Sequence, residues 1–298
     1  MHTKRVLLIG SNVKEDIRTS MMQSFQEEFS QGLARAGISG EVSICHYDEI
    51  SFLISKDSFV VTDHHNNEEL STYDLVIFKG AIRRSYIAQI ICTYLISRGV
   101  RFMNNYTRYR TINKLAQLVE MHMLGLSLPK TLYIENRQLF IGILKTAWKF
   151  PLVIKSINSS RGRYNFLVQS LKETQDILRK YPKIQFMAEE YIAKGSNYRI
   201  LCIGEETLLF ERGQKEAQYL KNTAQGVSIT QLPLKTISSE VIIQARALME
   251  KMQMTIAGID VIYESDSTYA FLEINAQPAI GHPTSFDPLS RLLKAQLS

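Results

Sequence analysis

The stretch YAFLEINAQPAIGH, residues 269–282, decides how this chain is interpreted. Its first half is apolar and rich in β-favouring residues, which predicts a buried strand. This strand carries Glu273 and Asn275 two residues apart, and Pro278 follows shortly after its end. Side chains two residues apart on a strand point to the same face. The predicted core strand therefore presents a carboxylate and a carboxamide side by side, which calls for a chemical reason.

The preceding segment AGIDVIYE, residues 257–264, supplies a partner strand. If the two strands pair around a turn at residues 265–268, Glu264 faces Tyr269, and Asp260 then lies directly opposite Glu273. Both carboxylates share one face with Asn275. The alternate residues are expected on the core face: Ile259, Val261, Leu272 and Ile274.

Two carboxylates that face each other across a ladder repel and weaken the strand pair. A divalent cation between them removes the repulsion, and two carboxylates with an amide oxygen are donors that Mg²⁺ accepts beside water and phosphate. We therefore predict a metal site made of Asp260, Glu273 and Asn275. The alternative is a half-solvated sheet in which the facing carboxylates are accidental or are neutralised by a lysine.

The composition is that of an ordinary folded protein. The 298 residues are enough for two or three sub-domains, and 45% of them are hydrophobic. No run approaches the roughly 20 apolar residues of a membrane span, and the apolar run Val6 to Ile9 is too short for a signal peptide. Three well-separated cysteines give no disulfide or zinc pattern. These features predict a cytoplasmic protein without a membrane partner.

The net charge of +6 raises the question of nucleic-acid binding. The basic residues are scattered, without a Lys/Arg run or a basic motif interleaved with aromatic residues. A mildly basic enzyme surface that favours anionic ligands is therefore the preferred interpretation, and no nucleic-acid partner is expected.

The hydrophobic pattern changes near residue 105. Before it, short β runs at 5–10, 41–50 and 74–80, and a short strand followed by a polar turn within 58–71, alternate with helical spacing at 20–37 and 86–100. This pattern predicts an open, largely parallel α/β sheet. After it, helices at 111–126 and 241–254 accompany antiparallel hairpins, one of them over 198–213 with its turn at 204–206. The second part is thus predicted to be α+β.

GIDVI at 258–262 and FLEINAQP at 271–278 resemble the metal-binding end of the ATP-grasp ligases, and the nearest branch looks like the RimK-type glutamate ligases and glutathione synthetases. The likeness is strongest from Asn104 to Pro278. It implies an α/β pre-ATP-grasp domain at 1–104, a central ATP-grasp sub-domain with the phosphate loop at 105–190, and a C-terminal sub-domain with the metal site at 191–298.

The resemblance implies phosphate-binding roles for two lysines. Lys114, in TINKLAQLV, and Lys155, which ends the strand FPLVIKS, match the lysines that lie against the α- and β-phosphates. Without the resemblance, each reads as a solvated lysine at a helix or strand end. KSINSSRGRYNFLV resembles the loop that folds over the phosphates, and it keeps Gly162 but has Tyr164 where the family usually has another glycine.

MAEEYIAKGSNYR, residues 187–199, resembles the hinge that holds adenine and ribose. By position, Glu190 takes the adenine amino group, and the backbone of Tyr191 and Ile192 pairs with the ring edge. Asn197 stands where an aspartate more often meets the ribose, and its amide can still bind hydroxyls. The alternative is an acidic strand end followed by a glycine turn.

Further along, Arg199 and Arg212 are expected on adjacent strands of one hairpin, as part of the nucleotide site. Arg212 matches the family's arginine near the transferred phosphoryl group, and Asn222, in YLKNTAQGV, matches a residue near the metal. A guanidinium keeps its charge and grips two oxygens at once. The alternative for Arg212 is a surface arginine after a hairpin.

The implied reaction joins a carboxylate to an amine with ATP, through an acyl phosphate, and releases ADP and phosphate. It requires ATP and one or two Mg²⁺ ions, for which Mn²⁺ can substitute, with Arg212, Lys155 and Asn275 in catalytic roles. The substrates are small molecules or peptides, and a homodimer would be common among similar enzymes. The alternatives are a phosphotransferase on the same fold and a non-catalytic nucleotide-binding regulatory module.

Two further groups of polar residues occur in the first part of the chain. Lys79, Arg83 and Arg84 follow the strand at 74–80, where an open α/β sheet presents its ligand crevice, so they are candidates for gripping an acidic substrate; a solvated loop explains them equally well. Asp63, His64 and His65 are interpreted as a polar turn in preference to a metal cluster.

Overall fold

The computed structural model describes residues 3–10, 15–79, 85–105, 113–159, 164–193, 195–212, 229–265, 267–276, 278 and 287–297. Gly162 and Asn222, both predicted at the nucleotide site, lie outside the described residues, and so do Arg83 and Arg84. Among the described residues, no helix combines the length and the apolar character needed to span a bilayer.

The first part of the chain is built on a parallel sheet, as predicted. Its strand order is β2 (Gly40–His46), β1 (Lys4–Gly10), β6 (Leu75–Phe78) and β7 (Arg101–Met103), and all neighbours are parallel. Helices α1 (Glu15–Arg35) and α2 (Ser85–Arg98) return the chain between strands. The strand predicted over 41–50 is shorter than expected, because the Glu49 carboxylate accepts a hydrogen bond from the His46 amide and closes a turn.

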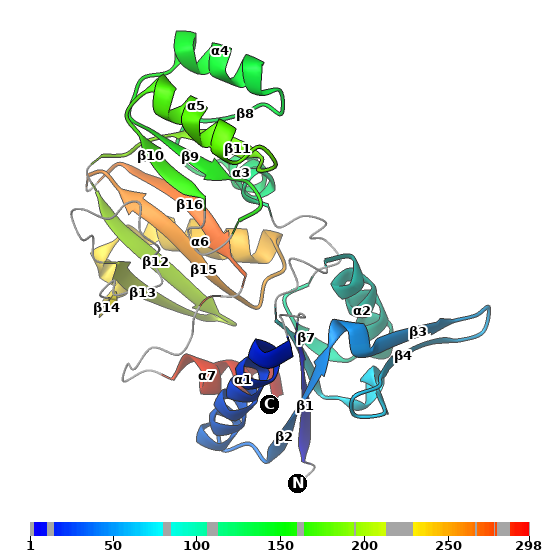
Figure 1. Cartoon of the computed structure of the whole chain (residues 1–298). Coiled ribbons are helices and arrows are strands. Elements are labelled where there is room, and N and C mark those ends of the chain that lie inside the picture. Colours follow the sequence, from blue (N-terminus) through cyan, green and yellow to red (C-terminus); the bar gives the residue numbers. More distant parts are fainter. Residues whose placement is uncertain are drawn as a thin grey trace.

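A small antiparallel sheet extends from this first part (Figure 1). It consists of β3 (Ile50–Ile54), β4 (Phe59–Asp63) and β5 (Glu68–Glu69). The turn after β4 is organised by Asp63, whose buried carboxylate accepts from the amides of His65 and Asn66 and from the Tyr73 hydroxyl. Asp63 therefore acts as a turn anchor in this structure.

The central sheet is antiparallel, with the order β10 (Asn165–Val168), β9 (Leu152–Ser156), β11 (Phe186–Glu190) and β8 (Thr131–Tyr133). Helices α4 (Arg137–Ala147) and α5 (Leu171–Lys180) cover its outer face (Figure 1). That face is apolar, and it packs Ile154, Phe186 and Ala188 against Phe140 and Leu144. Because strand side chains alternate, the intervening residues point to the inner face.

The third sheet has the order β14 (Ile229–Leu232), β13 (Glu206–Arg212), β12 (Ser196–Ile203), β15 (Ile256–Tyr263) and β16 (Tyr269–Asn275). The predicted hairpin over 198–213 is present as β12 and β13. Helix α6 (Ser239–Lys251) packs on one face, and α3 (Lys114–Met123) lies against β16. The opposite face of β12, β15 and β16 carries the polar residues described below.

The last helix, α7 (Pro288–Leu297), packs beside α1 (Figure 1) and also contacts β12 and β13, where Arg291 forms an ion pair with Glu206. Its leucines Leu289, Leu292 and Leu293 share a core with Leu33 of α1. A side chain at Gly32 would meet Leu289 Cγ at 2.9 Å, so the glycine permits this close approach. The division at residues 104 and 190 stays a proposal, and α7 joins the first part of the chain to the third sheet.

Asn104 connects the end of the first sheet to the third. Its buried side chain accepts from the amides of Thr255 (3.0 Å) and Ile256 (3.2 Å) and donates to the carbonyl of Ala276 (2.6 Å). Its backbone has a φ of 64°, a conformation that asparagine tolerates better than most residues. One side chain thus satisfies backbone groups at the ends of both β15 and β16.

We predict that Asn104→Ala lowers the free energy of unfolding by about 3 kcal/mol, because it leaves buried backbone groups without partners and places alanine at positive φ. Urea denaturation measures the change. Asn105→Ala is the matched control, because the Asn105 side chain makes an exposed bond to Gln253. If Asn104→Gly matched the wild-type stability, the hydrogen bonds would not be the cause.

Candidate active site

Asp260 and Glu273 face each other as predicted, but β15 and β16 pair in a different register near the turn. Asp260 lies opposite Glu273, whereas Tyr263, and not Glu264, pairs with Tyr269. A β-bulge between Asp260 and Val261 restores the alignment, because it leaves Leu272 as an extra residue. Consequently Phe271, and not Leu272, is the buried residue opposite Val261.

Protein cations neutralise both carboxylates. Arg199 on β12 lies opposite Asp260 in the ladder and binds it through two nitrogens, Nε to Oδ1 at 2.7 Å and Nη2 to Oδ2 at 2.8 Å. Arg212 Nη1 reaches Asp260 Oδ2 at 3.1 Å, and Lys114 Nζ bonds to Glu273 Oε2. The repulsion between the carboxylates is therefore relieved by side chains, and the pair by itself does not require a metal ion.

The cluster carries an excess of positive charge. Three cationic side chains face two carboxylates, which leaves one positive charge uncompensated among the described residues. Burial lowers the pKa of Arg199, but the charge and hydrogen bonds of Asp260 outweigh it and the pKa is raised. Burial lowers the pKa of Arg212, and the positive charge of Arg199 lowers it further. The charge of Asp260 raises it, but the net shift is downward. Arg212 is thus the less compensated guanidinium, and the cluster favours an anionic ligand.

Asn275 connects the two halves of the cluster. With its carboxamide nitrogen turned toward Glu273 Oε1 (2.9 Å), its oxygen accepts from Arg199 Nη2 (3.0 Å). In the opposite orientation the nitrogen lies 3.5 Å from Asp260 Oδ2. The first orientation satisfies both ends of the amide, so we assign it from the hydrogen-bond network.

Gly258 makes room for Arg199. It lies on β15 two residues before Asp260, on the same face, and opposite Asn275. A Cβ atom at this position would lie 3.2 Å from Arg199 Cδ, 3.3 Å from its Nε and 3.2 Å from Pro278 Cβ. The guanidinium therefore reaches Asp260 by passing over a residue without a side chain.

A second charged pair lies on the inner face of the central sheet. Lys155 on β9 is buried and forms an ion pair with Glu189 on β11. Lys155 pairs with Met187 in the ladder, and Glu189 is two residues further on, so both side chains share one face. Glu189 is only 3% exposed, and its Oε1 atom has no hydrogen-bond partner among the described residues.

The neighbouring Glu190, predicted to bind adenine, has the opposite orientation. It is exposed, and it shares the face of Phe186 and Ala188, which is the face covered by helices. Sequence reasoning missed Glu189, because two adjacent glutamates at a strand end give no signal for which one points inward. Only the pairing with β9 decides this.

The other predicted residues are distributed around these two groups. Asn197 is on β12 two residues before Arg199, so it shares the Asp260 face, and Tyr191 and Ile192 follow β11 and are half-buried. Tyr164 adopts a φ of 60°, the left-handed conformation that a glycine would take easily, and its ring packs edge-on against Tyr181. Tyr164, which stands where the resemblance leads one to expect glycine, therefore adopts the left-handed backbone conformation itself.

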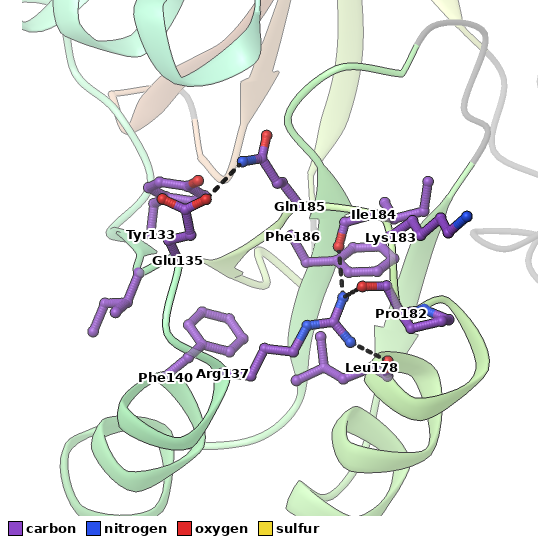
Figure 2. Close-up of a pocket in the computed structure, with 11 residues that line it drawn as sticks. Tyr133, Glu135, Arg137, Phe140, Leu178, Pro182, Lys183, Ile184, Gln185 and Phe186 are labelled. Carbon is purple, nitrogen blue, oxygen red and sulfur yellow. Dashed lines mark hydrogen bonds between the residues drawn. The ribbon is translucent and has the colours of Figure 1, made fainter.

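Figure 2 shows a cavity on the outer side of the central sheet, lined in part by Phe140 and Phe186. The Arg137 side chain crosses this cavity. Its guanidinium donates hydrogen bonds to the carbonyl of Leu178, in the last turn of α5, and to three carbonyls after the helix, those of Tyr181, Pro182 and Ile184. These bonds occupy the guanidinium and fix the end of the helix. None of the predicted site residues with a described position lines this cavity, so it is not part of the candidate active site.

Comparison with known proteins shows the family to which the chain belongs. A family model, that of the RimK-like ATP-grasp domain, matches residues 110–285, more than half of the chain. A curated relative, a probable alpha-L-glutamate ligase of Vibrio parahaemolyticus, is 23% identical over 222 residues, which cover 72% of each chain.

Two solved structures share the fold. The ATP-grasp ligase PsnB, complexed with a minimal precursor, Mg and ADP, has a TM-score of 0.69 at 15% identity, over 98% of this chain and 97% of that one. D-alanine–D-alanine ligase from Bacillus anthracis, complexed with ATP, has a TM-score of 0.64 at 16% identity, over 94% and 88%. The chain belongs to the RimK-like ATP-grasp family, and this family match defines it as an ATP-dependent ligase. Its activity is the ATP-dependent joining of a carboxylate to an amine.

We predict that Gly258→Ala lowers the ligase kcat by about tenfold, because the new methyl group displaces the Arg199 side chain by a few tenths of an ångström. Steady-state phosphate release measures the effect. Gly142→Ala in α4 is the control: nothing lies within 4 Å of its added Cβ, so activity should stay at the wild-type level. Equal activity of Gly258→Ala and wild type would contradict the assigned role.

Proposed function

We propose that the Asp260 cluster and the Lys155–Glu189 pair are the two halves of the ATP site, and that the enzyme uses ATP there to activate a carboxylate as an acyl phosphate. The observation that carries this assignment is the uncompensated positive charge around two facing carboxylates. A polyphosphate is the anion that such a cluster suits, because several cations can each contact a different oxygen.

We assign the phosphate contacts from the charge of each side chain and from the hydrogen-bond donors that its carboxylate partner does not occupy. Lys114 and Lys155 bind the α- and β-phosphates, and each is held in advance by a carboxylate. Arg199 is fixed by its two-nitrogen contact with Asp260, whereas Arg212 uses one nitrogen in that contact. Arg212 is therefore the residue we assign to the transferred phosphoryl group, where its remaining donors stabilise the developing charge.

Asp260, Glu273 and Asn275 fit a hard divalent cation by their chemistry, because all three present oxygen donors on adjacent strand positions of one face. The site already has excess positive charge, so a cation fits there only together with the phosphates. When bound, Mg²⁺ neutralises phosphate oxygens and lowers the charge repulsion against an incoming carboxylate. One or two ions, and Mn²⁺ in place of Mg²⁺, are compatible with this donor set.

On the base side, we assign the adenine amino group to Glu189 and no longer to Glu190. Glu189 faces inward and has one buried oxygen without a hydrogen-bond partner in the part of the chain that the structure describes, as an acceptor for an amino group requires. The backbone of Tyr191 and Ile192 then pairs with the ring edge, and Asn197, on the Asp260 face, meets the ribose. Lys155 is bound to the other oxygen of Glu189, which supports its assignment to the same nucleotide.

The reaction proceeds in two successive nucleophilic displacements. A carboxylate oxygen of one substrate attacks the γ-phosphorus of ATP, and ADP leaves. The amine of the second substrate then attacks the carbonyl carbon, phosphate leaves, and the amine loses a proton. The chain's own residues orient these groups and screen charge, and none is required as a nucleophile. Because curated relatives are named for glutamate, we propose an amino acid or a peptide as the substrate class.

The direct test is incubation with ATP, Mg²⁺ and pooled amino acids and peptides, with phosphate release and product masses measured together. We expect phosphate release that depends on the added substrates and a product mass equal to two substrates less one water. Phosphate release without a condensed product would indicate a hydrolase instead, and a phosphorylated substrate without free phosphate would indicate a phosphotransferase.

We predict that Asp260→Asn and Glu273→Gln each lower turnover by at least about 100-fold. Asp260→Asn should also lower the free energy of unfolding by about 2 kcal/mol, because it leaves two partly buried guanidinium groups without their counterion. A second readout is nucleotide affinity as a function of Mg²⁺ concentration, which should lose its Mg²⁺ dependence in both variants. A Mg²⁺ dependence equal to that of the wild type would contradict the metal assignment.

Glu189→Gln is predicted to weaken ATP binding by about tenfold, because one charged acceptor is lost. Glu190→Gln is the matched control and should bind ATP as the wild type does, since its side chain is exposed on the other face. Calorimetric titration gives both dissociation constants. The reverse order of the two effects would restore the original assignment to Glu190.

A further inference from the structure

Asn165 is a polar residue at a position that the nucleotide assignments above do not use. It begins β10 and lies directly opposite Lys155 of β9, so both side chains are on the inner face of the central sheet. Its neighbours in sequence confirm this orientation, because Phe166 and Val168 belong to the apolar core on the helix-covered face. Asn165 therefore points toward the same side as Lys155 and Glu189.

The Asn165 side chain contains an unsatisfied acceptor. Its Oδ1 atom is buried and has no hydrogen-bond partner among the described residues. Leaving such an acceptor unpaired costs about 1–3 kcal/mol, whereas a valine would suit a strand at this position better. Glu189 Oε1 is in the same condition on the same face. Two buried acceptors thus flank Lys155, one on each neighbouring strand.

The chemistry of the nucleotide limits what can satisfy these acceptors. The phosphates and ring nitrogens of ATP only accept hydrogen bonds, and its donors are the 6-amino group and the two ribose hydroxyls. The ribose is assigned to Asn197 on β12, which belongs to the other sheet. The 6-amino group, with two hydrogens, is the donor left for the inner face of the central sheet.

We propose that Asn165 is a specificity-determining residue that accepts a hydrogen bond from the 6-amino group of the nucleotide base, alongside Glu189. This inference rests on the proposed function, because it requires ATP to occupy the inner face of the central sheet. It gives the buried Asn165 oxygen at the start of β10 a hydrogen-bond partner. A base with a 6-oxo group would bring a third acceptor against these two, so the site selects adenine over hypoxanthine.

The test compares three nucleotides in calorimetric titrations with wild type and Asn165→Val. The nucleotides are ATP, purine riboside triphosphate, which lacks the 6-amino group, and 2′-deoxy-ATP, which lacks one ribose hydroxyl. We expect wild type to prefer ATP over purine riboside triphosphate, and Asn165→Val to bind ATP about tenfold more weakly while its affinity for purine riboside triphosphate is unchanged. The ratio between ATP and 2′-deoxy-ATP should be the same in both proteins.

Asn165→Leu, which preserves the shape of asparagine, gives a second variant with the same expected pattern, and thermal unfolding checks that both variants fold. Undiminished ATP affinity in both variants would overturn the inference while leaving the proposed function intact. A loss confined to the preference for the 2′-hydroxyl would also overturn it, because Asn165 would then contact ribose. If wild type bound none of the three nucleotides, the proposed ATP site itself would be wrong.

Discussion

The contact on which the site depends is the carboxylate of Asp260 between two guanidinium groups. The three side chains in this contact come from consecutive strands of one sheet: Arg212 from β13, Arg199 from β12 and Asp260 from β15. Charges in such a partly buried place are costly unless they are paired, and removing one partner leaves the others uncompensated. The ladder of the third sheet and the charge distribution of the site therefore stabilise each other.

This arrangement also explains how acidic residues and a positively charged site coexist. The carboxylates orient the cations before any ligand is present, and the remaining positive charge attracts an anion. The same pattern occurs on the central sheet, where Glu189 holds Lys155 in place. In both sheets a carboxylate positions a cationic side chain, so little side-chain reorganisation is needed when the phosphates bind. Cations that are already in position favour phosphoryl transfer.

Small backbone features make the cluster possible. The bulge at Leu272 brings Glu273 opposite Asp260 after a turn whose register alone would have separated them. Gly258 leaves space for the Arg199 side chain, and Asn104 closes the ends of β15 and β16. Each of these features acts on the backbone or on packing, and none carries the chemistry itself. They are nevertheless what brings the reactive side chains to one face.

The sequence alone determined the features that depend on local periodicity: the parallel first sheet, the hairpin over β12 and β13, and a carboxylate pair on β15 and β16. Its prediction of Asp260 opposite Glu273 was correct although the turn register was one residue off, because the bulge compensated the error. The tertiary structure decided which cations neutralise that pair, that Glu189 and not Glu190 faces inward, and that α7 returns to α1. The physical reason is that local periodicity fixes the faces of a strand or helix, whereas the neighbours that cover each face are far away in the chain.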